Sequence, residues 1–147
     1  MGAVTLVDTN VLLRLLQTQH PQHSVVEAAL AELLRQDADL CIAPQNLVEA
    51  WVVATRPVAE NGIGMTPLTI AAQWRRLTGA FRLLEGAPGV ASAWEDLVVR
   101  HSVSGKKAHD AHLVAVMQVY GVTDVLTFNI ADFQRYPGIH VLDPMQL

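Results

Sequence analysis

The sequence predicts an α/β fold, with a central parallel sheet flanked by helices, from two observations. Short β-rich runs alternate with amphipathic helical patterns along the chain, which is typical of parallel strands joined by helices. The chain is also 51% hydrophobic, with a mean hydropathy of +0.27, as expected of a sheet buried on both faces. Since 147 residues is a usual size for one domain, we expect residues 1–147 to form a single domain.

The first half of the chain is predicted to alternate between strands and helices. Its expected elements are a strand at 4–7, a helix that includes Val11, Leu12, Leu15 and Leu16, a helix at about 24–35, a strand at 39–43 and a helix at about 45–55. Ser24 is suited to cap the second helix, because its hydroxyl can accept a hydrogen bond from a free backbone N–H. The residues of the third helix expected to face inward are Leu47, Val48, Trp51 and Val52.

The second half of the chain continues the alternation. Its expected elements are a loop at 57–66, a helix from Thr66 onward, a short strand at 81–84, helices at about 91–101 and 108–120, a strand at 123–127, a loop at 128–133 and a strand at 139–142. Pro67 fits the first turn of its helix. Gly121 fits the position after a last helical turn, where a left-handed backbone is common.

Composition and charge exclude several classes of protein. No apolar run is long enough to cross a bilayer and the start of the chain has no basic segment, so we expect no membrane segment and no signal peptide. The one cysteine, Cys41, favours a reducing cytoplasm, and its apolar neighbours favour a buried core residue over a catalytic one. The net charge of −4 argues against a protein that coats nucleic acid, but not against an enzyme that acts on it through bound cations.

Acidic and amide side chains fall where sites form in parallel sheets. Asp8 directly follows the first strand, Glu49 lies in the early turns of the helix after the second strand, and Asp110 opens its helix. Asn129 and Asp132 follow the next-to-last strand. Because the carboxyl ends of parallel strands meet at one edge of the sheet, we expect these side chains to converge.

Such a cluster points to a divalent cation, because converging carboxylates repel one another and resist burial. Mg2+ prefers oxygen ligands and is usually held by one or two carboxylates, and no His or Cys pattern has zinc spacing. Each residue also has an ordinary alternative role. Asp8 can cap a helix, Glu49 can be an exposed acid, Asp110 can complement a helix dipole, and Asn129 and Asp132 can form turns.

A more specific signal comes from the segments LVDTNVL at 6–12, NLVEAW at 46–51, AHDAHLVA at 108–115 and LTFNIADF at 126–133. Their order and neighbours resemble the PIN-domain nucleases, and in particular the VapC-type ribonuclease toxins of type II toxin–antitoxin systems, over nearly the whole chain. The resemblance implies a PIN-like fold, Mg2+- or Mn2+-dependent cleavage of RNA and often a homodimer. It also implies a short antitoxin that wraps the helices near the N-terminus and blocks the acidic pocket.

The resemblance also implies the roles of individual residues. Asp8, Glu49 and Asp110 correspond to the catalytic acids, and Asp8 and Asp110 are the expected metal ligands. Asn129 stands where many relatives carry a fourth acid. A second metal is therefore expected to bind weakly or not at all, unless Asp132 supplies the missing charge at longer reach.

Hydrolysis of a phosphodiester needs an activated water, positive charge at phosphorus and help for the leaving oxygen. Glu49 is expected to hold a water or act as the base. The residues expected to support the carboxylates are Thr9, Asn10 and Thr127, and those expected to bind RNA are Lys106 and Lys107. Weaker candidates for phosphate contacts are Arg14, Arg75, Arg76 and Arg82, while His109 and His112 are interpreted as structural or solvent-facing.

Three other interpretations compete with the toxin. A phosphatase that uses a nucleophilic Asp usually has a second acid two residues later, and Asn10 at that position disfavours it. A non-catalytic binding module with a degenerate site is compatible with Asn129. A PIN nuclease of RNA processing or decay, without an antitoxin, is compatible with the same residues.

Overall fold

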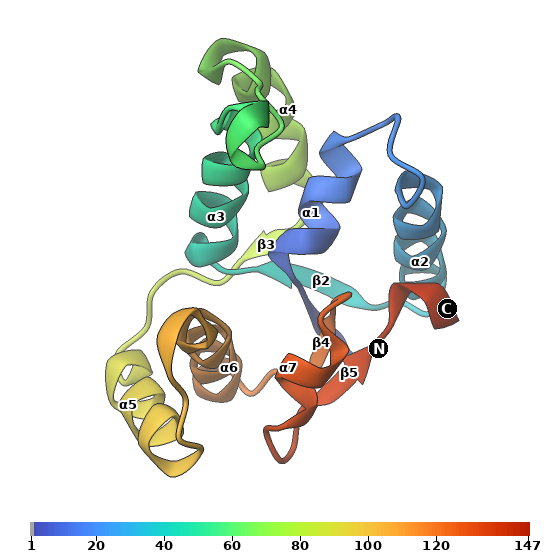
Figure 1. Ribbon diagram of the computed structural model, residues 1–147. Coiled ribbons are helices and arrows are strands. Elements are labelled where there is room, and N and C mark those ends of the chain that lie inside the picture. The colour runs from blue at the N-terminus through green and yellow to red at the C-terminus, as the bar shows by residue number, and fades with distance from the viewer. Residues whose placement is uncertain (1) are drawn as a thin grey trace.

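The computed structural model describes residues 2–147 and contains a parallel sheet with the strand order β3-β2-β1-β4-β5 (Figure 1). The strands are β1 (Val4–Val7), β2 (Asp39–Ile42), β3 (Arg82–Leu83), β4 (Asp124–Leu126) and β5 (His140–Leu142). Each adjacent pair is parallel, so the carboxyl ends of these strands share one edge of the sheet. The predicted fold class is confirmed.

Helices cover both faces of this sheet. They are α1 (Thr9–Leu16), α2 (His23–Arg35), α3 (Pro44–Thr55), α4 (Pro67–Ala80), α5 (Val90–Arg100), α6 (Ala108–Tyr120) and α7 (Ile130–Gln134), with short 3-10 helices η1 (Val58–Glu60), η2 (Gly105–Lys107) and η3 (Pro144–Gln146). Figure 1 shows α1 to α4 on one side of the sheet and α5 and α6 on the other.

The strands supply alternate residues to two separate cores, because successive side chains of a strand point to opposite faces. Leu6 and Val125 pack in the core that contains α5 and α6. Val7 and Leu126 pack in the core that contains α1 to α4. All four side chains are fully buried, which explains why the strands read as continuous apolar runs.

Helix α6 lies deep in the molecule and fixes the position of Asp110. The segment 113–117 is buried throughout, so this helix packs on several sides. It ends at Gly121, whose φ of 72° is the left-handed conformation that glycine adopts without a Cβ clash. The predicted bounds of this helix are confirmed, and Asp110 lies in its first turn.

Local predictions failed in three places. Gln22 rather than Ser24 is the N-cap residue of α2. The segment 128–133 was predicted to be a loop, but it contains the start of α7, which forms where Phe133 is buried in the core. The inward face of α3 was wrong in part. Leu47 and Trp51 pack against the core as predicted, but Val48 and Val52 are 63% and 50% exposed, and the buried residues are Asn46, Ala50 and Ala54.

Two compositional predictions can be compared with the structure. Cys41 is buried and its Sγ lies 3.4 Å from the carbonyl oxygen of Thr5. Burial raises the pKa of this thiol to about 12, so the reactive thiolate is disfavoured and the prediction of a core cysteine is confirmed. Among the helices of residues 2–147, none combines the length and apolar character that crossing a membrane requires.

Candidate active site

The candidate site begins where β1 and β4 end side by side. Val7 and Leu126 are aligned in register, and the backbone N–H of Asp8 donates to the carbonyl of Leu126 at 3.0 Å. The next residue of each strand, Asp8 and Thr127, therefore leaves the sheet at the same point. The Thr127 hydroxyl donates to Asp8 Oδ2 at 2.7 Å.

Asp8 has both of the roles that its sequence position suggested. It is the N-cap residue of α1, and its Oδ1 accepts a hydrogen bond from the backbone N–H of Thr9 at 2.7 Å. Its other oxygen faces Thr127. The side chain is only 4% exposed, so capping does not explain why a carboxylate is buried here, since an exposed Asp caps equally well.

The buried position of Asp8 changes its proton affinity. Burial raises its pKa to about 6, hydrogen bonds from Thr127 and Thr9 oppose that shift, and the charges of Glu49 and Asp132 add to it. Burial disfavours the charged form because the carboxylate loses hydration. The pKa of Asp8 therefore reflects both removal from water and nearby negative charge.

Glu49 is held in place by a chain of hydrogen bonds that starts in the backbone of α3. Asn46 Oδ1 accepts from the N–H of Ala43 at 2.8 Å, and Asn46 Nδ2 donates to the Thr9 hydroxyl at 3.1 Å. Thr9 in turn donates to Glu49 Oε1 at 2.8 Å. This chain joins the first turns of α1 and α3 and orients the carboxylate from residues that carry no charge.

Asp110 faces the same cluster from α6. It is partly buried, and its pKa is raised to about 7. Burial is the largest cause, followed by the charges of Asp8, Asp132 and Glu49, while Lys107 lowers the pKa. Three other carboxylates thus act on Asp110, which places the four acids in one electrostatic neighbourhood.

Asp132 contributes its side chain to this group of acids, whereas Asn129 contributes only its backbone. Asp132, in the first turn of α7, lies 3.5 Å from the ammonium group of Lys107 and acts on the pKa of both Asp8 and Asp110. Asn129 is exposed and contacts the site through its backbone N–H, which donates to the Thr127 hydroxyl at 2.9 Å.

Asn10 joins the strand ends to α1. Its Nδ2 donates to the Thr127 hydroxyl at 3.3 Å, and its Oδ1 accepts from the N–H of Phe128 at 3.3 Å. Thr127, fully buried, therefore accepts hydrogen bonds from Asn10 and Asn129 while donating to Asp8. The structure places all three predicted supporting residues, Thr9, Asn10 and Thr127, in contact with the carboxylates or with one another.

The donor set fits a hard cation with few protein ligands. Within residues 2–147, no three or more His, Cys, Asp or Glu side chains are arranged so that all of them hold one ion. Mg2+ does not require such a cage, because it retains several waters and usually takes one or two carboxylates directly. Asp8 and Asp110, whose pKa values are raised by burial and by neighbouring carboxylates, are suitable ligands for that ion.

The candidate cations divide into two groups. Lys106 and Lys107 lie in η2, immediately before α6, and Lys107 reaches the acids through Asp132. The arginines named from the sequence have other surroundings. Arg14 is hydrogen-bonded to Gln17 and Gln22, and Arg82 forms an ion pair with Asp39 at 2.8 Å. Arg76 lines a cavity that contains none of the candidate-site acids.

Sequence reasoning missed Asn46 and Gln45 as parts of the site. Asn46 is fully buried, and the signal for it was an amide at the third position of a helix, where a side chain can return to the N-cap backbone. Gln45 Nε2 donates to Glu49 Oε2 at 3.3 Å and to the carbonyl of His109 at 2.8 Å. The available signal for Gln45 was its position four residues before Glu49 on the same helix, whereas its contacts with His109 and His112 come from α6 and have no sequence pattern.

The two histidines also differ from each other. His109 is exposed, with its Nδ1 3.8 Å from Glu49 Oε2. His112 is partly buried and hydrogen-bonded to Gln45, and burial lowers its pKa. The neutral ring of His112 is thus favoured near neutral pH.

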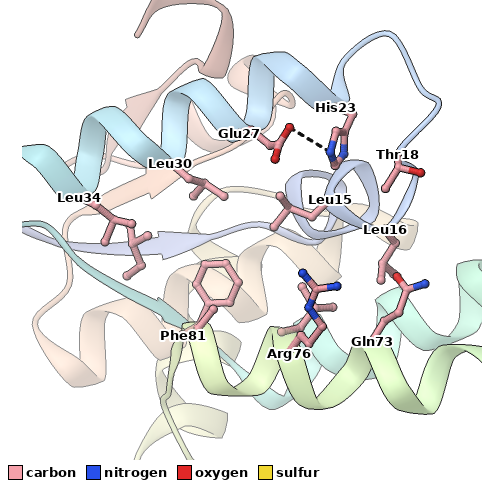
Figure 2. A pocket seen from close by; sticks show the side chains of 13 residues that line it. Leu15, Leu16, Thr18, His23, Glu27, Leu30, Leu34, Gln73, Arg76 and Phe81 are labelled. Carbon is pink, nitrogen blue, oxygen red and sulfur yellow. Dashed lines mark ion pairs between the residues drawn. The ribbon is translucent and has the colours of Figure 1, made fainter.

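A separate cavity of about 490 Å³ lies between α1, α2 and α4. Figure 2 shows Leu30 and Leu34 of α2 facing Phe81 across it, with Leu15 of α1 to one side. His23 and Glu27 form an ion pair of 3.1 Å at its border. Its lining contains none of the converging acids, so this cavity and the acidic cluster are distinct features.

Comparison with known proteins gives a family model and a full-length relative. The model of the PIN domain matches residues 5–139. Ribonuclease VapC24 of Mycobacterium tuberculosis is 28% identical over 145 residues, covering 95% of this chain and 95% of that protein. The match therefore includes every element that contributes to the acidic cluster.

Solved structures share the fold at low sequence identity. VapBC2 from Rickettsia felis, bound to a DNA fragment from its promoter, has a chain that superposes with a TM-score of 0.71 at 14% identity, covering 95% of this chain and 98% of that one. A toxin–antitoxin complex from Klebsiella pneumoniae contains a chain with a TM-score of 0.65 at 20% identity, covering 95% and 97%. At these identities the similarity concerns the arrangement of the sheet and its helices.

Proposed function

The chain belongs to the PIN-domain family, and from that premise we propose that it is a divalent-metal-dependent endoribonuclease that acts as the toxin of a toxin–antitoxin pair. One observation carries the proposal: Asp8 and Asp110 are buried or partly buried in a cluster with Glu49 and Asp132, whose charges raise the pKa of both. Such a cluster is costly without a cation. The ribonuclease name of the relative at 28% identity supports RNA as the substrate.

We propose that Asp8 and Asp110 hold the metal, Mg2+ or Mn2+. Asp8 is fixed by Thr127 and by the N-terminus of α1, and Asp110 by the first turn of α6. A divalent cation bound there supplies positive charge at the phosphate and makes water more acidic. Asp132 is the proposed source of the fourth negative charge, in place of the exposed Asn129.

Glu49 is proposed to orient water or accept its proton. The Thr9 hydroxyl and the Gln45 amide donate to different oxygens of this carboxylate, so its orientation is restrained from two sides. The exposed Lys106 and Lys107 are proposed to contact RNA phosphates, since flexible lysine side chains bind phosphate as point charges.

The proposed protein partner is a short antitoxin that covers helices near the N-terminus. The cavity between α1, α2 and α4 supports this proposal, because its apolar wall includes Leu34, which is 57% exposed. Larger apolar patches that are open to solvent are typical of interaction sites. The toxin assignment predicts growth arrest on expression and a small neighbouring gene whose product relieves that arrest when the two are co-expressed; expression without any effect on growth would contradict the assignment.

Cleavage of RNA by the wild type beside Asp8→Asn tests the enzyme assignment. The wild type is expected to cleave only when Mg2+ or Mn2+ is present. Asp8→Asn is expected to remove cleavage and remain folded, because the amide keeps an oxygen for the Thr9 N–H. Equal cleavage by both proteins, or cleavage that persists in a chelator, would reject the proposed site.

A further inference from the structure

A second recess, of about 370 Å³, adjoins the acidic cluster on the side of α3 and α6. Gln45, Trp94, Ala108, His109 and His112 line it. These residues come from three helices that are distant in sequence. The volume falls within the range of about 300–1,000 Å³ that is usual for small-molecule sites.

The lining of this recess is aromatic and carries no acid. An indole ring and two imidazole rings contribute to it. Rings of this kind bind unstacked nucleobases, because every base has a flat π-face and stacking tolerates any sequence. Within the described part of the chain, no lysine or arginine lines the recess, so it suits the base of a nucleotide better than its phosphate.

The walls of the recess are held in place. The indole N–H of Trp94 donates to the carbonyl of Ala108 at 2.9 Å, which joins α5 to the start of α6. The side-chain amide of Gln45 forms hydrogen bonds with the His112 ring, the carbonyl of His109 and the Glu49 carboxylate. Trp94, Gln45 and His112 therefore have little side-chain freedom to lose on binding, and such preorganisation favours affinity.

The same contacts join the recess to the acids. Gln45 lies one turn before Glu49 on α3 and contacts its carboxylate at 3.3 Å. His109 is the residue before Asp110, and its ring lies 3.8 Å from Glu49. A nucleotide whose phosphate lies at the acids therefore has this recess within the reach of a neighbouring base.

We propose that the recess lined by Trp94, His109 and His112 binds a nucleobase next to the scissile phosphate of the RNA. The proposal rests on the proposed nuclease function and adds a subsite to it. Lys106 and Lys107 immediately precede Ala108 and His109 of the recess lining and supply positive charge for the flanking phosphates. The subsite grips one unpaired base by stacking, which favours single-stranded RNA over a duplex.

An abasic scan of a short RNA tests the subsite. Asp8→Asn protein is titrated into a fluorescent single-stranded RNA with Mg2+ present, and into versions that lack the base at one position each. Anisotropy gives the ratio of dissociation constants, abasic over intact. We expect a ratio of about 5 to 150 at one position, the range that corresponds to stacking of a single base.

Measuring the same ratio of dissociation constants in further variants shows which side chains contact the base. His112→Ala, added to Asp8→Asn, is expected to bring the ratio close to one. Trp94→Phe keeps an aromatic ring and is expected to retain most of the ratio. His140→Ala is the matched control, because His140 begins β5 and pairs with Asp124 at the opposite edge of the sheet; it is expected to leave the ratio unchanged.

The outcomes separate the subsite from the enzyme. A ratio near one at every position in a protein whose wild type cleaves RNA would overturn the subsite and leave the nuclease intact. Equal weakening of intact and abasic RNA by His112→Ala would also overturn it. If the wild type does not cleave RNA but the ratio is large and His112→Ala removes it, base binding in the recess would be supported and the proposed nuclease function rejected.

Discussion

At the scale of single residues, the acidic cluster is stabilised by uncharged neighbours. Thr127 donates to Asp8, and Thr9 donates to Glu49. Hydrogen bonds of this kind lower the pKa of a carboxylate and oppose the effect of burial. Even so, the pKa of Asp8 is raised to about 6 and that of Asp110 to about 7, so the metal-free site is electrostatically unfavourable at neutral pH.

These shifts predict how the stability of the metal-free protein depends on pH. Both pKa values are higher in the folded chain than the value of about 4 expected in the unfolded chain, so the folded state binds protons more tightly. The resulting stability is fully present below about pH 4 and is lost as pH rises through about 6 and 7. Melting temperatures in a chelator, measured from pH 4.5 to 8, should fall along this interval.

The comparison with Asp8→Asn isolates the contribution of Asp8 from those of other titrating groups. The variant lacks the charge, so its melting temperature should fall less between pH 5 and 7 than that of the wild type. It should also match or exceed the wild type at pH 8 without metal. If the melting temperatures of both proteins fall equally with pH, Asp8 does not carry the buried charge.

Asn46 is the uncharged residue whose removal should cost most. Asn46→Ala leaves the N–H of Ala43 without its partner and the hydroxyl of Thr9 without a donor. We expect a loss of about 1–3 kcal/mol in the free energy of unfolding, measured with urea. Cleavage should fall about 10–100-fold, as is usual when support for a metal ligand or acid is lost.

Gln118→Ala is the control for Asn46→Ala. Gln118 is an exposed residue of α6, and surface substitutions usually change the free energy of unfolding by less than about 0.5 kcal/mol. If Asn46→Ala has the same stability and activity as Gln118→Ala, the proposed hydrogen-bond chain is contradicted.

At the scale of elements, the sequence predicted long periodic helices well and exposed faces poorly. Helix α6 was predicted with its bounds because its apolar residues continue to a glycine that ends it. On α3 the same logic failed. Val48 and Val52 are apolar yet exposed, whereas the polar Asn46 is buried by hydrogen bonds to Ala43 and Thr9, and periodicity cannot distinguish these cases.

The exposed valines of α3 lead to a prediction about assembly. The family resemblance implies a homodimer, and we propose that Val48 and Val52, which form an exposed apolar strip, lie in its contact. Val48→Asp combined with Val52→Asp should produce a monomer in sedimentation experiments with little change in melting temperature. Val99→Asp, on α5 and 74% exposed, should leave the dimer intact, and a wild type that sediments as a monomer would contradict the contact.

At the scale of the whole molecule, the alternation of strands and helices determined which predictions succeeded. Parallel pairing of β1 with β4 brings Asp8 beside Thr127, although 119 residues separate them. Topology alone therefore predicted that the acids share an edge of the sheet. Their catalytic and metal-binding roles stay predictions.

The sequence did not predict contacts that depend on side-chain direction. The pairing of Lys107 with Asp132 depends on how α6 packs against α7, and the recess around Trp94 and His112 on how α3, α5 and α6 meet. A net charge of −4 also gave no hint of local cations. Net charge describes the surface average, whereas substrate binding depends on where individual charges lie.

Calorimetric titration with Mn2+ tests the central claim, that converging carboxylates form a site for a divalent cation. The wild type should bind Mn2+ at millimolar concentrations or below, Asp8→Asn and Asp110→Asn should each bind at least about 10-fold more weakly, and Asp96→Asn, an exposed acid on α5, should bind as the wild type does. No binding by the wild type at millimolar Mn2+, or equal binding by all four proteins, would contradict the account.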